Sequence, residues 1–194
     1  MYAGRPIPVI PNYDNLILIN AGPEGDTFIS DKSIVKVFHF TGDTYEDNDF
    51  IKICEISKFL SDKIPLYVPL IYEIYTNSNF VALIMEHVDS VTLGEFIRNK
   101  ADVASKDIAT VVVSLCNAIG NIHKMGYVHS DFHRGNILVT RDFKVKIIDF
   151  SCSDVISSVD PGDGLTPRIY TDYCLLLHHL ADLIFNNFPN CCAA

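Results

Sequence analysis

The sequence predicts an α+β fold, with a small antiparallel sheet and one helix in the first half and a mostly helical second half. Short β-branched runs separated by Gly, Asn and Ser turns dominate up to about residue 88, and longer segments with apolar residues at helical spacing follow. The chain has 194 residues, of which 48% are hydrophobic and 20% charged, so it can bury a core. We therefore expect one domain with two lobes, residues 1–88 and 89–194.

The first half is expected to be a meander of strands interrupted by one helix. A proline-containing segment at 1–13 predicts an extended arm, and the acidic run at 43–49 predicts a loop. Apolar residues at helical spacing then predict an amphipathic helix. The expected elements are strands at 16–19, 27–29 and 34–38, a helix over 50–60, and strands at 70–74 and 80–85.

Capping residues organise the second half. Thr92 is expected to cap a short helix, and Ser105 a long helix that Gly126 ends in a left-handed conformation. The final helix is apolar and is expected to begin at Thr171, with Thr171 or Asp172 as its cap. The expected elements are helices over 93–98 and 106–124, strands at 137–139 and 145–148, a loop over 152–168 and a helix over 171–185.

Composition disfavours several classes of protein. The net charge is −9 and Lys and Arg form no cluster, so we expect no direct nucleic-acid binding. The first residues lack a signal-peptide pattern and no apolar run is long enough to span a bilayer, so no membrane attachment is expected. Six Cys without a Cys-x-x-Cys pair indicate reduced thiols in the cytoplasm, and no lipidation is expected at Cys191 and Cys192.

The most specific chemical signal lies in two short segments. Residues 129–136 read His-Ser-Asp-Phe-His-Arg-Gly-Asn, and residues 148–151 read Ile-Asp-Phe-Ser. Asp131, Asn136 and Asp149 thus carry oxygen-bearing side chains that a strand-loop-strand hairpin can bring together. Two of them suit Mg²⁺, and the first suits a hydroxyl that must lose its proton. This set predicts the transfer of phosphate from a metal-bound nucleotide.

The two segments resemble the catalytic loop and the metal-binding loop of the protein-kinase-like superfamily. The resemblance implies a bilobal fold, with ATP and Mg²⁺ as cofactors. It implies that Asp131 takes the proton of the acceptor hydroxyl and that Asn136 and Asp149 bind the metal. His133 stands where most Ser/Thr kinases have Lys, and is expected to meet the γ-phosphate as a donor. His129 is expected to support the loop from behind.

The resemblance extends into the first half. Lys36, in an apolar strand, and Glu55, nineteen residues later on the expected helix, resemble the Lys–Glu pair that the family uses near the nucleotide phosphates. The alternative to such a pair is that the Lys36 side chain points to solvent from a half-exposed strand. Gly22 and Gly25 resemble a reduced form of the turn that covers the phosphates with backbone N–H groups, but two Gly are also common in an ordinary hairpin.

Residues 81–88 resemble the last strand and the hinge of the family's small lobe. Met85 is expected at the back of an adenine pocket, with the carbonyl of Glu86 and the amide of Val88 at the adenine edge and Leu138 as the floor. Asp172 resembles the buried helix-start Asp that ties down the catalytic loop. An ordinary Asp favoured by the helix dipole is the alternative, and both readings can hold together.

Several positions depart from the family pattern. Ser130 replaces the Arg that grips a phosphorylated activation loop, so control by loop phosphorylation is not expected. Ser151 replaces a Gly and restricts backbone movement there. No Ala-Pro-Glu follows, and the chain ends soon after the Asp172 helix, so we expect a truncated second lobe. In this compactness the chain resembles the atypical kinases, namely the kinase of the KEOPS complex and the RIO group.

Three functions are compatible with these residues. The first is a compact atypical Ser/Thr kinase or a self-phosphorylating ATPase within a complex, and the second is a small-molecule phosphotransferase of the aminoglycoside or choline-kinase type. The third is a kinase mimic that regulates a partner. A protein substrate or complex partner is expected at the shortened second lobe, and oligomers are compatible with it. The apolar residues expected to lack cover are Leu175, Leu176, Leu177, Leu180, Leu183 and Ile184.

Overall fold

The computed structural model describes residues 7–22, 25–30, 33–99, 102–156 and 166–185 of the chain. The chain divides into two compact units. The first contains Met1–Pro65 and Pro69–His87, and the second contains Leu66–Val68 and Val88–Ala194. An antiparallel sheet dominates the first unit and helices dominate the second, so the predicted α+β fold class is confirmed.

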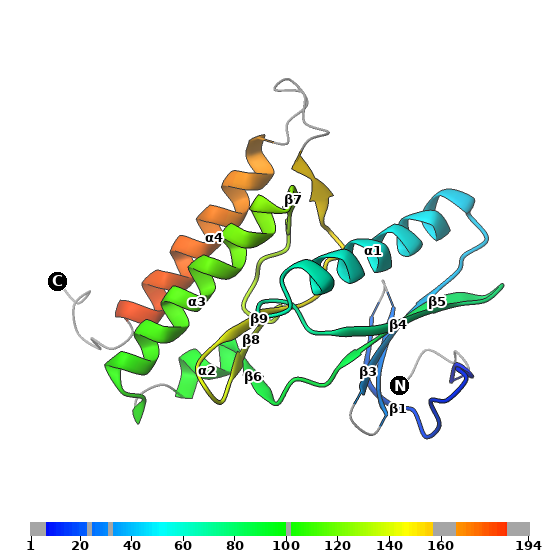
Figure 1. The fold of residues 1–194 in the computed structure, drawn as a ribbon, viewed down its shortest axis with the longest axis horizontal. Coiled ribbons are helices and arrows are strands. Elements are labelled where there is room, and N and C mark those ends of the chain that lie inside the picture. The colour runs from blue at the N-terminus through cyan, green and yellow to red at the C-terminus, as the bar shows by residue number, and fades with distance from the viewer. Residues whose placement is uncertain (1–6, 23–24, 31–32, 100–101, 157–165, 186–194) are drawn as a thin grey trace. The chain divides into compact units, whose positions relative to one another are not determined.

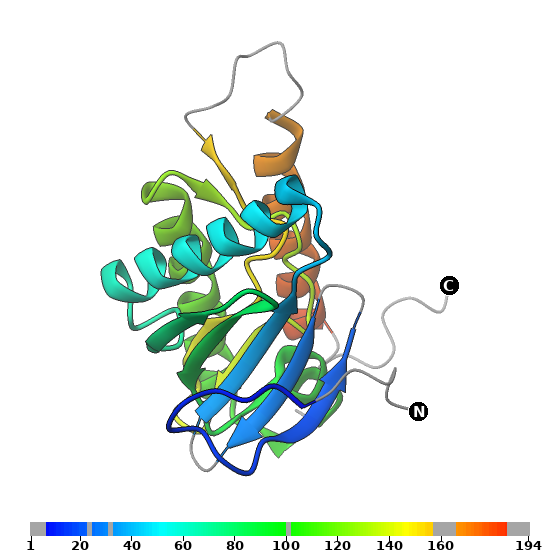
Figure 2. The ribbon, with the colours of Figure 1, turned by 90° about the vertical axis from the view of Figure 1, so that its right-hand side faces the viewer.

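The first unit is built on a five-stranded antiparallel sheet (Figure 2). The strand order is β1-β2-β3-β5-β4, and strands of this unit exist at each place where the sequence predicts one. Their bounds are β1 Ile17–Ala21, β2 Asp26–Ser30, β3 Ser33–His39, β4 Ile71–Thr76 and β5 Phe80–Glu86. Strand β3 lies at the centre of the sheet, where it pairs with β2 and β5, and it buries Val35, Val37 and Phe38.

Both faces of this sheet are covered. The described part of the N-terminal arm lies against one face, where Ile10 and Leu16 pack with Phe28, Val35 and Val37 (Figure 2). Helix α1, Thr44–Lys63, covers the other face, where its Cys54 packs with Phe38, Val81 and Leu83. Because side chains alternate along a strand, Lys36 of β3 lies on the same face as Phe38, the face covered by α1.

The acidic run at 43–49 is not the loop that the sequence predicts, because α1 begins inside it. Asp43 is the N-cap, and its carboxylate accepts a hydrogen bond from the backbone N–H of Tyr45 at 2.8 Å. Glu46 and Asp47 stand in the first turn, where the helix dipole favours negative charge. The run of acidic residues is therefore a helix start rather than a connection.

The second unit combines three helices with short strands. The helices are α2 Leu93–Asn99, α3 Ser105–Lys124 and α4 Thr166–Phe185, and Figure 1 shows α3 and α4 lying side by side. One small sheet has the order β6-β8-β9, and a second pairs β10 with β7. Their bounds are β6 Ser90–Thr92, β7 Tyr127–Val128, β8 Ile137–Thr140, β9 Val145–Ile147 and β10 Asp154–Val155. The strands β6, β7 and β10 have only two or three residues and were not predicted.

Of the four helix ends for which the sequence predicts a cap in this unit, those at Thr92 and Gly126 are confirmed. Thr92 accepts from the backbone N–H of Glu95 at 3.2 Å, and the Glu95 carboxylate accepts from the backbone N–H of Thr92 at 2.8 Å, which is a reciprocal capping box. Gly126 has φ 88° after α3, as predicted. The Ser105 cap is wrong, because Ala104 is the N-cap and makes no side-chain hydrogen bond.

Helix α4 begins at Thr166, five residues before the predicted start. Pro167 falls in its first turn, where the missing N–H of proline is tolerated, so the proline marks the helix start rather than the end of a loop. Asp172 therefore lies inside the helix and is not its cap. The rest of the predicted loop at 157–165, and the Cys191-Cys192 tail, lie outside the described residues. Among the described helices, none combines the length and apolar character needed to cross a bilayer.

Candidate active site

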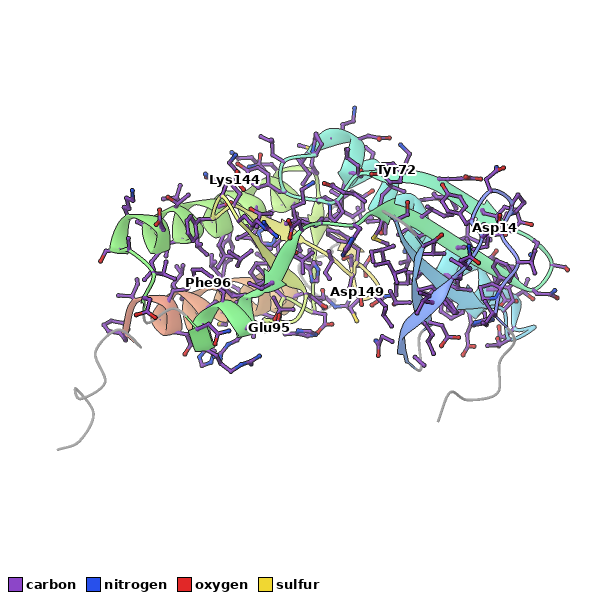
Figure 3. The ribbon with its side chains drawn as sticks, turned by 90° about the horizontal axis from the view of Figure 1, so that it is seen from below. Asp14, Tyr72, Glu95, Phe96, Lys144 and Asp149 are labelled. Carbon is purple, nitrogen blue, oxygen red and sulfur yellow. The ribbon has the colours of Figure 1, made fainter. Side chains whose placement is uncertain are left out.

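The β8–β9 hairpin places Asn136 and Asp149 at the same end. Ile137 pairs with Ile147 across the two strands, and the backbone N–H of Ile148 donates to the carbonyl of Asn136 at 2.9 Å. Asn136 thus precedes one strand where Asp149 follows the other. Figure 3 shows Asp149 at the end of the hairpin away from Lys144, which stands at the turn.

Asn136 contacts Asp131 directly. The amide nitrogen of Asn136 donates to the backbone carbonyl of Asp131 at 3.0 Å and to its carboxylate Oδ2 at 2.9 Å. Both amide protons are used in this way, so the amide Oδ1 is the remaining polar atom of the Asn136 side chain. Asn136 is buried and the Asp131 side chain is 40% exposed. The structure therefore places Asn136 in contact with Asp131, and it places Asp149 at the same end of the hairpin as Asn136.

Two residues of the site adopt left-handed backbone conformations. Asp149 has φ 65° and Ser130 has φ 64°. Residues other than Gly rarely adopt this conformation, although Asn and Asp do so more often than most, and it concentrates at functional sites where surrounding contacts enforce it. The Ser130 hydroxyl is buried without a hydrogen-bond partner among the described residues. The backbone of Ser130, rather than its side chain, is thus the part that the fold holds in place.

Asp172 of α4 holds the backbone of the loop. Its Oδ2 accepts from the N–H of His129 at 2.8 Å and its Oδ1 from the N–H of Ser130 at 2.9 Å. The ring Nε2 of His123, near the end of α3, lies 2.9 Å from the same Oδ2. Asp172 is fully buried, so its charge is balanced by these three donors. The predicted anchoring of the loop by Asp172 is confirmed.

An aromatic cluster lies beneath the loop. The His129 ring centroid is 5.8 Å from that of Phe132 and 5.0 Å from that of Phe150, and the Phe132 ring is 5.9 Å from His179 of α4. His129 donates from Nε2 to the carbonyl of Ile148 at 3.1 Å, and His179 donates from Nε2 to the carbonyl of Phe132 at 2.8 Å. Burial lowers the pKa of both imidazoles, so they are neutral donors.

These two imidazoles predict acid sensitivity. A His in the unfolded chain titrates near pH 6.5, whereas the folded chain holds His129 and His179 neutral to lower pH. Below about pH 6.5 the unfolded state therefore binds protons that the folded state does not, and the free energy of unfolding falls until the folded pKa is reached. Urea unfolding between pH 8 and pH 5 measures this loss. His179→Gln should flatten the slope, and the exposed His87→Gln should leave it unchanged.

His133 turns towards Asp131. Its Nε2 lies 3.5 Å from the Asp131 Oδ2, and its Nδ1 accepts from the backbone N–H of Gly135 at 2.9 Å. A Cβ atom on Gly135 would lie 2.8 Å from the His133 ring, so only Gly fits beneath this ring position. The structure places the ring against the predicted base, and the predicted contact of His133 with a γ-phosphate stays a prediction.

Sequence reasoning missed Arg134 as a residue that positions the loop. Its guanidinium pairs with Asp182 of α4 and lies 3.2 Å from the His178 Nε2. Its carbonyl accepts from the N–H of Gly94 in α2 at 3.4 Å. The loop is thus tied to two helices through one residue. The partner Asp182 lies 48 residues further along the chain, and no local pattern indicates such a pairing.

In the first unit, the charges of Lys36 and Glu55 both influence the pKa of the buried Cys54 thiol. Burial raises the pKa of Cys54 to about 12, while the charge of Lys36 lowers it and the charge of Glu55 raises it. The Lys36 Nζ also lies 5.0 Å from the Phe38 ring centroid. Lys36 is half-buried and Glu55 is exposed. The structure therefore places the two predicted partners on the same side of the sheet, and their ion pair stays a prediction.

The predicted phosphate-covering turn joins β1 and β2. The N–H of Gly22 donates to the carbonyl of Gly25 at 2.9 Å. A Cβ atom on Gly25 would lie 2.5 Å from the carbonyl oxygen of Val37 on β3. Gly25 is therefore required for the packing of this hairpin on β3, as well as being a candidate for phosphate contact.

The predicted adenine-binding residues lie on several elements. Met85 and Glu86 end β5, where the Glu86 N–H donates to the carbonyl of Leu70 at 2.8 Å and its carboxylate accepts from the Leu70 N–H at 3.0 Å. Val88 is in the second unit, where its carbonyl accepts from the Ser90 hydroxyl at 3.1 Å. Leu138 is half-buried on β8. Their roles stay predictions.

The oxygen donors of the second unit suit Mg²⁺ better than a metal ion whose ligands all come from the protein. Within the described ranges, no three His, Cys, Asp or Glu side chains gather as metal ligands would. Asn136 Oδ1 and the Asp149 carboxylate are two hard oxygen donors at neighbouring backbone positions. Mg²⁺ is commonly bound by one or two protein oxygens together with water and substrate phosphates, so this small donor set suits it.

Sequence comparisons agree with this geometry. The sequence profile of the protein kinase domain matches residues 35–181. The chain is 32% identical over 85 residues to serine/threonine-protein kinase cds1 of Schizosaccharomyces pombe, covering 44% of the chain and 18% of that protein. It is 27% identical over 136 residues to a probable serine/threonine-protein kinase PknB of Lactococcus lactis, covering 68% of the chain and 21% of that protein.

A third relative shows the same pattern. PknB of Mycolicibacterium smegmatis is 27% identical over 84 residues, which cover 43% of the chain and 13% of that kinase. The chain thus matches between 13% and 21% of the length of these relatives. The profile match spans most of the chain, including β3 from Val35 onwards, the 129–136 loop, Asp149 and Asp172. This chain belongs to the protein kinase domain family.

Proposed function

We propose that this chain transfers the γ-phosphoryl group of Mg·ATP to a Ser or Thr hydroxyl of a protein. The observation that carries the proposal is the contact between Asp131 and Asn136 beside Asp149, on a loop that Asp172 fixes from below. Phosphoryl transfer needs little covalent chemistry from the protein. It needs positioned oxygens and positive charge, and the residues at this site supply the oxygens.

Each residue has a distinct role in this proposal. Asp131 accepts the proton of the acceptor hydroxyl, and the Asn136 amide, bonded to its Oδ2, fixes the orientation of the carboxylate. Asn136 Oδ1 and Asp149 hold Mg²⁺, which neutralises phosphate charge when it is bound. Lys36 adds a permanent positive charge for the phosphates. The left-handed backbone at Asp149 keeps its carboxylate at the hairpin end.

The comparisons favour a protein as the acceptor. The three relatives described above are all named as serine/threonine-protein kinases, which supports a protein hydroxyl over an aminoglycoside or choline acceptor. We further propose a compact atypical kinase that phosphorylates itself or acts within a complex. The described cysteines, Cys54, Cys116, Cys152 and Cys174, are free thiols, which supports a reducing, cytoplasmic compartment.

Binding of a partner at the second unit is also part of the proposal. Leu176 and Leu183 of α4 are buried, which corrects the expectation that they lack cover. Other apolar side chains of α4 are exposed, and this observation favours a contact with another protein. They are Tyr170, Tyr173, Leu177, Ile184 and Phe185.

Nucleotide binding tests the proposed function. A ligand present at a hundredfold excess over its Kd stabilises a protein by about 2.7 kcal/mol, which for a chain of this size raises Tm by roughly 5–10 °C. We expect this rise with ATP and Mg²⁺ together and a smaller one with ATP alone. Asp149→Asn should remove the part that depends on Mg²⁺. A Tm that ATP and Mg²⁺ leave unchanged contradicts the proposal.

A further inference from the structure

A groove of about 500 Å³ lies along α3 within the second unit. Its lining comes from three segments, which are α3, residues 66–67 and the turn of the β8–β9 hairpin. Leu66 and Val113 line it with 69% and 58% of their surface exposed, so the groove is open along its length and is not an enclosed cavity. Apolar side chains so exposed at one place are typical of a surface that another molecule covers.

Two hydrogen bonds donated by the backbone of β9 hold the three walls together. The N–H of Ile147 on β9 donates to the carbonyl of Tyr67 at 2.7 Å. The N–H of Val145 on the same strand donates to the hydroxyl of Ser114 on α3 at 2.9 Å, and Ser114 is itself buried. The groove is therefore preformed, and a ligand would not have to assemble it.

The charge of the groove differs from that of the chain. The chain has a net charge of −9, whereas the groove lining contains Lys106 and Lys144 and no carboxylate. Lys144 pairs with the neighbouring Asp142 at 2.6 Å, and both side chains are well exposed, so the pair can open at little cost. Lys106 has no ion pair with any other residue of the described ranges. The groove is thus an apolar strip with two lysines at its edge, of which Lys106 is unpaired among the described residues.

The groove has the length of a short extended peptide. The lining residues on α3 run from Lys106 to Asn117, and eleven residues of helix span about 16 Å. An extended chain advances about 3.3 Å per residue, so roughly five residues cover this length. Alternate side chains of such a segment point to opposite sides, so apolar residues can enter the groove while acidic ones face the two lysines.

We propose that the α3 groove binds a short segment of a partner protein in which acidic and apolar residues alternate. Charge complementarity with Lys106 and Lys144, and apolar contact with Leu66 and Val113, select this occupant. Lys144 and Asp149 stand at opposite ends of the hairpin, about 17 Å apart along an extended chain (Figure 3). The bound segment therefore leaves the Asp131 site open, and its binding does not depend on phosphoryl transfer.

Fluorescence anisotropy tests the groove with a defined probe. The probe is a fluorescein-labelled pool of pentapeptides with Asp or Glu at the outer and middle positions and Leu, Ile, Val or Phe between them. We expect saturable binding to the full chain that weakens as salt is added. Lys106→Glu and Val113→Asp should each lower the affinity at least tenfold, because one reverses the edge charge and the other places a charge on the apolar strip.

Lys124→Glu is the matched control, since it makes the same charge change at the far end of the same helix, outside the groove. It should leave the affinity within about twofold of the parent, because screening leaves distant surface charges little effect. Circular dichroism shows whether each variant keeps its helix content. The proposal is overturned if the pool shows no saturable binding, if both groove variants bind like the parent, or if Lys124→Glu weakens binding as much as Lys106→Glu does.

Discussion

Asp131→Asn is expected to lower the rate of phosphoryl transfer by about 10²–10⁴-fold, the usual contribution of a positioned general base. The asparagine side chain has the same shape, but its amide is not basic enough to take the proton from the hydroxyl that is being phosphorylated. In the parent, the Asp131 Oδ2 also accepts a hydrogen bond from the Asn136 side-chain amide at 2.9 Å. The amide oxygen of an asparagine at position 131 can still accept this bond. The loop should therefore keep its conformation while the chemistry is lost.

The measurement is transfer of label from γ-³²P ATP under single-turnover conditions, with Mg·ATP affinity measured in parallel. Asp142→Asn is a suitable control, because Asp142 is an exposed carboxylate at the hairpin turn, with a side chain 59% exposed. It should change neither rate nor affinity. An Asp131→Asn protein that transfers phosphate at the parent's rate would show that Asp131 is not the base.

Asp172→Asn is expected to cost about 3 kcal/mol of stability, because two backbone N–H groups lose a charged acceptor and each such bond contributes roughly 1.5–3 kcal/mol. The site is fully buried, so water cannot replace the lost acceptor. For a chain of this size the loss corresponds to a Tm lower by roughly 10 °C. The rate of phosphoryl transfer should also fall, because Ser130 and Asp131 are no longer held in a fixed position once the loop is released.

Differential scanning calorimetry measures this loss, and Asp62→Asn provides the comparison. Asp62 pairs with Lys58 on the exposed face of α1, with 57% of its side chain exposed. Removing such a surface pair should cost less than about 1 kcal/mol. Similar Tm values for Asp172→Asn and the parent would mean that the two backbone hydrogen bonds to Asp172 do not hold the loop.

The parts of the site that depend on short sequence spacing could be predicted. Asp131, Asn136 and Asp149 lie on one hairpin and the loop before it, so the local chain alone brings them together. The strand position of Lys36 followed from the apolar residues on either side of it. The anchor at Asp172 was found through the resemblance to a family, because the spacing of 43 residues carries no local signal.

The parts that depend on distant pairing could not be predicted. Arg134 pairs with Asp182, and His179 donates to the carbonyl of Phe132, across 48 and 47 residues. Strand β10 pairs with β7 through two residues, which is too short for an alternation pattern. The start of α1 differs from the prediction for another reason. A run of acidic residues is typical of a polar loop, but the helix dipole also favours such residues in a first turn.

The central claim is that the oxygens at the hairpin end serve a metal-dependent phosphoryl transfer. The most direct test is transfer of label from γ-³²P ATP to protein, followed by phosphoamino acid analysis, with the parent chain and Asp149→Asn compared with and without Mg²⁺. We predict label on Ser or Thr for the parent with Mg²⁺, and at least a hundredfold less in the other three samples. Equal labelling by Asp149→Asn, or labelling that does not require Mg²⁺, would contradict the claim.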